Sequence, residues 1–231
     1  MTSHLGSFAR VAIVLGLALL AMPLLKGRSA SVRRLVLSVA LASVLVVPFV
    51  PAWHVEAPAY RELVGRLVAE PTVAAPGADG APPTSPATAG SVDWLALAWG
   101  VGVLVVGARF VIGLLRARRL VLRASAAPPA WEPTIAEAER RTGLRAVVRV
   151  SDEIEAPAVA GIFSPVVLVP ASSSSWTDER RLSVLLHELA HVAARDLGVQ
   201  VLATIACTLH WFDPLAWLAA RRLRLERELA A

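Results

Sequence analysis

Four long apolar stretches dominate this sequence and decide what kind of fold it can adopt. They cover residues 8–25, 35–53, 94–115 and 197–212. A helix that crosses the hydrocarbon core of a bilayer needs about 20 predominantly apolar residues. The first three stretches reach or approach that length, and the third contains a single charge, Arg109. The sequence therefore predicts three transmembrane helices in a multi-pass membrane protein, with the lipid bilayer as its main surroundings.

The composition agrees with a membrane protein and excludes several other classes. Hydrophobic residues make up 56% of the chain and charged residues only 18%, against about 25% in an average soluble domain. The single cysteine, Cys207, excludes a disulfide framework and a cysteine-based zinc cluster. The net charge of +5 does not predict a nucleic-acid partner, because the basic residues are not interleaved with aromatic residues.

The charged loops predict how the chain is oriented in the membrane. Residues 26–34 carry four positive and no negative charges, and residues 116–123 carry four positive charges. Residues 54–93 carry two arginines and five acidic residues, and they end in a Pro/Ala-rich run typical of a flexible linker. Because positive charges mark cytoplasmic loops, we expect 26–34 and the region after 115 in the cytoplasm and 54–93 outside.

Residues 116–196 are predicted to form one small cytoplasmic domain of the α+β class. A polar helix over 133–142 is followed by a strand over 145–150, since that segment alternates and is rich in β-branched residues. A second strand is expected over 166–169. The next helix begins near Thr177, a residue type that caps helix N-termini.

That last helix carries the motif HExxH, formed by His187, Glu188 and His191. Two histidines four residues apart present both imidazoles on one helix face, which suits a tetrahedral zinc ion. Glu188 lies beside that face, where a carboxylate can act as general base toward an attacking water. The motif therefore predicts a zinc-dependent hydrolase with Zn²⁺ as its cofactor.

The third protein ligand of such a site is not settled by the residues themselves. Ala194 and Leu197 stand where a metzincin needs a glycine and a third histidine, so that class is excluded. The remaining candidates are the carboxylates of Asp196, Glu226 and Glu228. Asp196 is close to the motif on the same helix, which suits support of a ligand, or a salt bridge at the helix end, better than direct coordination.

The segment 197–220 raises a question of topology. If it crossed the membrane completely, a helix over 221–231 would place its glutamates on the opposite side from the HExxH motif. Asp213 and Pro214 interrupt the segment, so it can instead dip into the membrane and return as a hairpin. Alternatively, it lies flat at the interface with its apolar face in the bilayer.

Four segments together resemble the BlaR/MecR-type membrane zinc metallopeptidases, which are antirepressors that respond to β-lactams. They are KGRSASVRRLVLSVAL, GIFSPVVLVP, LLHELAHVAARDLGVQ and LHWFDPLAWLAARRLRLERELA. The resemblance covers nearly the whole chain and implies a gluzincin, or zincin-like, domain at the cytoplasmic face of the bacterial cell membrane. It also implies that zinc is bound by the HExxH histidines and by a downstream glutamate.

The C-terminal segment aligns with the family pattern E-L-A-C-D and thereby identifies Glu228 as the third ligand by resemblance. Ala231 stands in place of the family's cysteine, and the sequence ends before the aspartate that supports a zinc-binding histidine in the family. No sensor domain follows, so the resemblance does not extend to β-lactam recognition. We expect the sequence to be a fragment of a longer protein, with a short stand-alone form as the alternative.

The resemblance further implies an endopeptidase that cleaves a cytosolic repressor, or itself, during signal transduction. In zincins an edge strand beside the active helix pairs with extended substrate, and we expect this role for Val166, Val167, Leu168 and Val169. The alternative is a membrane signalling module with a degenerate, non-catalytic zinc site. The sequence predicts neither an inducing signal nor an oligomeric state.

Overall fold

The computed structural model of the chain describes residues 2–47 and 93–230, and it is mostly helical with one small mixed sheet. The expected extracytoplasmic loop lies outside the described residues, apart from Asp93. In chain order, the elements are helix α1 (Thr2–Leu24), α2 (Ala30–Val46), α4 (Trp94–Arg123), strand β1 (Ser125–Ala126), α5 (Glu132–Thr142), β2 (Val147–Ser151), β3 (Ala158–Ala160), β4 (Val166–Pro170), α6 (Asp178–Ala193), α7 (Asp196–Leu209) and α8 (Pro214–Glu228).

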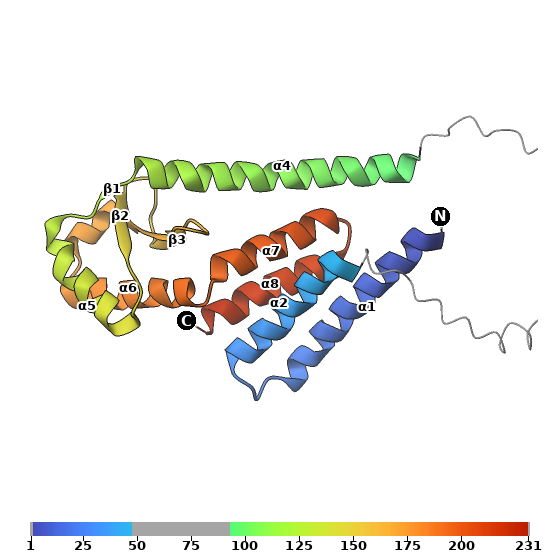
Figure 1. The fold of residues 1–231 in the computed structure, drawn as a ribbon, viewed down its shortest axis with the longest axis horizontal. Coiled ribbons are helices and arrows are strands. Elements are labelled where there is room, and N and C mark those ends of the chain that lie inside the picture. The colour runs from blue at the N-terminus through green and yellow to red at the C-terminus, as the bar shows by residue number, and fades with distance from the viewer. Residues whose placement is uncertain (1, 48–92, 231) are drawn as a thin grey trace, which may run out of the picture.

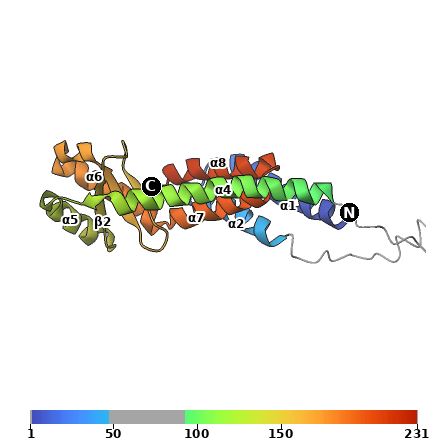
Figure 2. The same ribbon diagram turned by 90° about the horizontal axis from the view of Figure 1, so that it is seen from above.

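The molecule has two parts that are joined end to end, as Figure 1 shows. The sheet with α5 and α6 forms one part, which we call the sheet domain. Helices α1, α2, α7 and α8 form the other part, the helix bundle, and α4 extends along its outside. In the view from above (Figure 2), α4 again lies over the bundle and leads into the sheet domain at its C-terminal end.

The sheet has the strand order β1-β2-β4-β3, which corrects one sequence prediction. β4 pairs in parallel with β2 and in antiparallel with β3, so residues 166–169 lie inside the sheet and not at its edge. The edge strand beside α6 is β3. Its three residues, Ala158–Ala160, are too few to show an alternating pattern, whereas β4 is conspicuous in the sequence because it is buried and β-branched.

The HExxH helix is fixed to the sheet by its apolar face. Leu185 and Leu189 are fully buried, and they pack in one cluster with Trp131 and with Val167 and Val169 of β4. Successive helical residues are about 100° apart, so a residue two positions from these leucines points to the opposite face of α6. The packing of the leucines therefore turns the histidine face of α6 away from the sheet.

The helix bundle is held together by small residues where its helices approach each other. Ala216, Ala219 and Ala220 of α8 are buried, and they pack in one cluster with Leu37 and Leu41 of α2. Small side chains allow helix backbones to come close together, which is a common feature of membrane helix interfaces. Helix α8 is thereby seated against α2 along its length.

Among the described residues, α4 is the one continuous helix long and apolar enough to cross a membrane. None of its residues is buried. Helices α6 and α7 pass the same criterion only if taken together, and they are bent by 54° at their junction. The apolar part of α1, Ala9–Leu24, is shorter, and the predicted span 35–53 extends beyond the described part of α2.

Between α7 and α8 the chain reverses its direction. Asp213 caps α8 by accepting a hydrogen bond from the Leu215 amide at 2.9 Å, and Pro214 occupies the first turn, where its missing N–H costs nothing. The segment therefore has the form of a helical hairpin. Figure 1 shows α8 returning beside α7, so that its C-terminal end lies next to α6.

Candidate metal centre

The N-terminal end of α6 is defined by a capping residue. The Thr177 hydroxyl accepts a hydrogen bond from the Arg180 amide at 3.3 Å, and Asp178 and Glu179 place negative charge in the first turn. With the helix fixed in this way, His187 and His191 lie on one face. Their rings are 4.9 Å apart between centroids, in an edge-to-face arrangement.

Helix α6 ends in a sharp turn at Arg195. This residue has φ 54°, the one positive φ outside glycine among the described residues. The turn redirects the chain into α7 and brings Asp196 back toward the end of α6. There, Nδ1 of His191 lies 2.7 Å from Oδ2 of Asp196. A carboxylate on Nδ1 leaves Nε2 as the nitrogen that can bind a metal.

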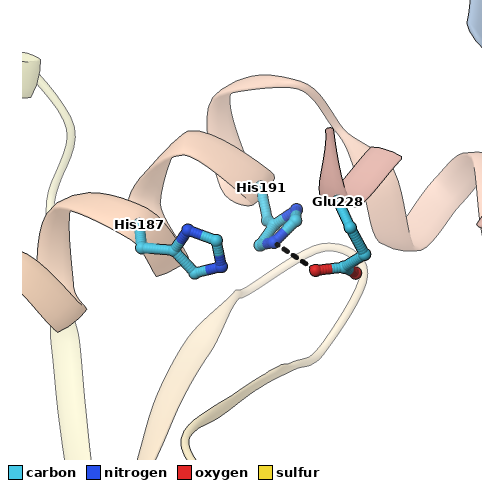
Figure 3. Close-up of side chains that lie close together, drawn as sticks. All are labelled: His187, His191 and Glu228. Atoms are coloured by element: carbon cyan, nitrogen blue, oxygen red, sulfur yellow. Dashed lines mark ion pairs between the residues drawn. The ribbon is translucent and has the colours of Figure 1, made fainter. Parts of the chain in front are cut away.

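Glu228 joins the two histidines from the far end of α8 (Figure 3). Oε2 of Glu228 lies 4.0 Å from Nε2 of His191. One ligand atom from each of His187, His191 and Glu228 lies within 4.8 Å of the other two. The structure thus brings together the three residues expected to hold zinc, although Glu228 is 37 positions from the motif in the chain.

The spacing and chemistry of this group fit a zinc ion. Two ligand atoms that each lie about 2.1 Å from a tetrahedral zinc ion are about 3.4 Å apart. The separations seen here are somewhat longer, but the Glu228 side chain is 65% exposed and free to rotate inward. Two imidazoles and one carboxylate, with an open fourth position, are the donor set of many catalytic zinc sites.

Glu188 lies next to this group in a partly desolvated position. Its side chain is mostly removed from solvent, since only 8% of the residue is exposed. This burial raises the pKa of the Glu188 carboxyl, while the imidazoles of His187 and His191 act in the opposite direction. A carboxylate with a raised pKa is suited to accept and then release a proton during hydrolysis.

The two remaining carboxylate candidates have other partners. Asp196 is 1% exposed, and besides His191 it contacts Arg34 through Oδ1 at 2.9 Å. Glu226 is fully buried and accepts a hydrogen bond from Nε of Arg33 at 2.6 Å. It lies outside the group of potential metal ligands. Asp196 therefore contacts His191, as support of that residue would require, and Glu226 connects α8 to α2.

Sequence reasoning missed the two arginines that meet these carboxylates. In the sequence, Arg33 and Arg34 contribute only to the positive charge that predicts a cytoplasmic loop over residues 26–34. They lie near the N-terminal end of α2 and reach carboxylates that are 193 and 162 residues away in the chain. The available signal was the presence of Asp196 and Glu226 in largely apolar segments, where a carboxylate needs a cationic partner, but nothing in the sequence identifies that partner.

The edge strand β3 lies beside α6 and has a strand partner, β4, on one side only among the described elements. The connection from β3 to β4 runs through Gly161, whose φ of 89° and close approach to the Ser164 carbonyl exclude a side chain. The free side of β3 can accept the backbone of an extended peptide.

Comparison with known proteins gave two findings. A family model described as BlaR1 peptidase M56 matches residues 6–231. Among curated proteins, the regulatory protein BlaR1 of Bacillus licheniformis is 26% identical over 92 residues. That match covers 40% of this chain and 15% of the relative, so the chain aligns with a small part of that protein's length.

Proposed function

This chain belongs to the BlaR1 peptidase M56 family, and on that premise we propose that it is a membrane-bound zinc endopeptidase with a cytoplasmic active site. The family consists of membrane-bound, zinc-dependent peptidases that act in signal transduction. The observation that carries the proposal is the convergence of His187, His191 and Glu228 from two separate helices onto one point beside Glu188.

In this proposal each residue has a distinct task. His187, His191 and Glu228 hold the zinc ion, and Asp196 orients the His191 ring through its Nδ1 atom. When bound, zinc supplies Lewis-acid chemistry that polarises a carbonyl group and acidifies water. Glu188 accepts the proton of the attacking water and delivers it to the amine of the departing peptide.

The substrate is an extended segment of a protein that pairs with β3. Because β3 contacts α6, we propose that a peptide bound in antiparallel fashion to the free side of Ala158–Ala160 runs past the metal centre. We propose a cytosolic repressor, or another part of the chain itself, as the protein cleaved. The matched relative is named a regulatory protein, which supports a role in regulation.

The charges of the loops and the shape of the bundle support a particular membrane arrangement. We propose that α4 spans the bilayer, that α1 and α2 form a second membrane hairpin, and that α7 and α8 dip in from the cytoplasm and return. The basic residues at the N-terminal end of α2 and the C-terminal end of α4 lie at the same end of the molecule, next to the sheet domain. That arrangement agrees with one cytoplasmic face.

The proposal is tested by zinc content and proteolysis together. The detergent-purified protein should contain one zinc ion per chain, and Glu228→Ala should retain much less. Glu188→Gln should retain zinc as the parent does but lose proteolysis of itself or of a candidate repressor. Proteolysis that survives Glu188→Gln would show that the assigned mechanism is wrong.

A second candidate function is a signalling module whose zinc site is not catalytic. It is favoured by the position of Glu228, the last residue of α8, where helix ends fray and where the side chain is 65% exposed. A correctly folded parent protein that holds no zinc and cleaves nothing would favour this function over the peptidase.

A further inference from the structure

Arg34 connects a membrane helix to the candidate zinc site. It is the fifth residue of α2, and its Nη1 atom donates a hydrogen bond to Oδ1 of Asp196 at 2.9 Å. The side chain of Asp196 is 2% exposed and that of Arg34 is 22% exposed. A hydrogen bond between two charged groups that are largely shielded from water is stronger than its exposed equivalent.

The two oxygens of Asp196 have different partners, and this decides what Arg34 does. Oδ2 lies 2.7 Å from Nδ1 of His191, and Oδ1 meets Arg34. With Oδ1 held, the carboxylate cannot rotate about its own bond without losing Arg34, so Oδ2 stays directed at the imidazole. Arg227 also approaches Oδ2, but at 3.4 Å and on the same oxygen as His191.

We propose that Arg34 is a positioning residue for the zinc ligand His191 and acts through Asp196. This rests on the proposed function, because it assumes that His191 binds zinc. The inference goes beyond the proposed function, because it makes the metal site depend on α2, a helix that supplies none of the ligands. The site is fully formed only while α2 is docked against α7 and α8, so any displacement of α2 loosens the metal.

The neighbouring residue keeps α2 in the required place. Arg33 donates from Nε to Oε2 of Glu226 at 2.6 Å, and from Nη1 to the Arg28 carbonyl at 2.6 Å. Glu226 is fully buried on α8, and Arg222 of the same helix lies 2.9 Å from its second oxygen. The two adjacent arginines of α2 thus contact the two helices that follow the HExxH helix.

The test compares zinc affinity, measured by competition with a chelator, in the full chain, in four single variants and in one double variant. Arg34→Gln should bind zinc about 10-fold more weakly, at the lower end of the loss that follows removal of a metal-bound histidine's own partner, because Arg34 acts one contact further away. Arg34→Lys keeps a charged donor and should recover part of the loss. Arg28→Gln is the matched control, since it removes the same charge six positions earlier in the chain, at an exposed side chain that has no partner among the described residues.

Asp196→Asn identifies the route of the effect. If Arg34 acts through Asp196, then Arg34→Gln should weaken zinc binding in the parent but have little further effect in the Asp196→Asn background. The absorption spectrum of the cobalt-substituted protein gives a second readout, because it reports ligand geometry and not general stability. It should change with Arg34→Gln and remain that of the parent with Arg28→Gln.

The possible results separate this inference from the proposed function. Zinc binding that is equally tight in Arg34→Gln and the parent would overturn the inference and leave the peptidase proposal intact. An undiminished effect of Arg34→Gln in the Asp196→Asn background would overturn the route through Asp196. A folded parent that binds no zinc would overturn both. If Arg34→Gln does not fold, Arg34→Lys in the two backgrounds provides the same comparison.

Discussion

The sheet domain and the helix bundle fix their functional residues by different means. In the sheet domain, α6 is held by large apolar side chains such as Trp131, Leu185 and Leu189. In the bundle, α8 is held by alanines and by the buried contact between Arg33 and Glu226. The candidate metal centre takes its two histidines from the first region and its glutamate from the second, so it reports whether the two regions are correctly joined.

The largest expected effect concerns Glu188, which on the proposed function takes part in the chemistry without holding either region in place. Glu188→Gln should lower the rate of proteolysis by about 10²- to 10⁴-fold, because general base catalysis contributes that much. Zinc content and the unfolding temperature should stay close to those of the parent. A large loss of zinc in this variant would show that Glu188 is also needed for zinc binding. The lower rate of proteolysis could then not be assigned to the loss of a general base.

The next largest effect is expected in the sheet domain. Leu189→Ala should lower the free energy of unfolding by about 2–5 kcal/mol, because it leaves a cavity under the HExxH helix. Thermal unfolding in detergent, followed by tryptophan fluorescence, should show the sheet domain melting earlier. The control is Leu122→Ala, a substitution on α4 at a side chain that is 68% exposed, which should leave the sheet domain unchanged.

A smaller effect is expected in the bundle. Ala219→Leu inserts a large side chain where α8 meets α2, and overpacking of this kind costs about 1–3 kcal/mol. If the two regions are joined through the metal centre, this variant should also lose zinc more easily, although it lies two turns from Glu228. Unchanged zinc retention together with reduced bundle stability would show that the two regions are independent.

The smallest effect concerns the start of the HExxH helix. Thr177→Ala removes the capping hydroxyl and should cost about 1 kcal/mol, while Thr177→Ser should cost much less because it keeps the oxygen. Both can be measured as shifts in unfolding temperature. Zinc affinity should not change, because the last turn of α6 is fixed separately by its contacts with the sheet and with Asp196.

The sequence predicts local features of the site well and long-range ones poorly. The HExxH helix, its cap at Thr177 and its zinc chemistry follow from spacing along one helix. The choice of Glu228 over Glu226 as the third zinc ligand depended on the family resemblance. Both glutamates are on one helix, and the sequence does not decide whether residues 197–220 cross the membrane, dip into it or lie flat on it. The structure separates them by contact, because Glu226 meets Arg33 and Glu228 does not.

The prediction that residues 166–169 form an edge strand was wrong for a physical reason. β4 is rich in valine because both of its neighbours are strands and both of its faces are covered, and such burial makes a strand conspicuous in a sequence. An edge strand that accepts a peptide needs little of this, so the three residues of β3 gave no signal. The strand that we propose to bind substrate was therefore difficult to predict from the sequence.

The contribution of distant helices to one site has a consequence for how the protein is made. Arg34 is translated before the HExxH helix and Glu228 after it, with 194 positions between them in the chain. When the ribosome has added the last residue of α6, both histidines are part of the chain but Glu228 is not, so the chain cannot yet close the site. On the proposed function, a newly synthesised chain stays without protease activity until α8 has folded back against α2, which protects the cell during membrane insertion.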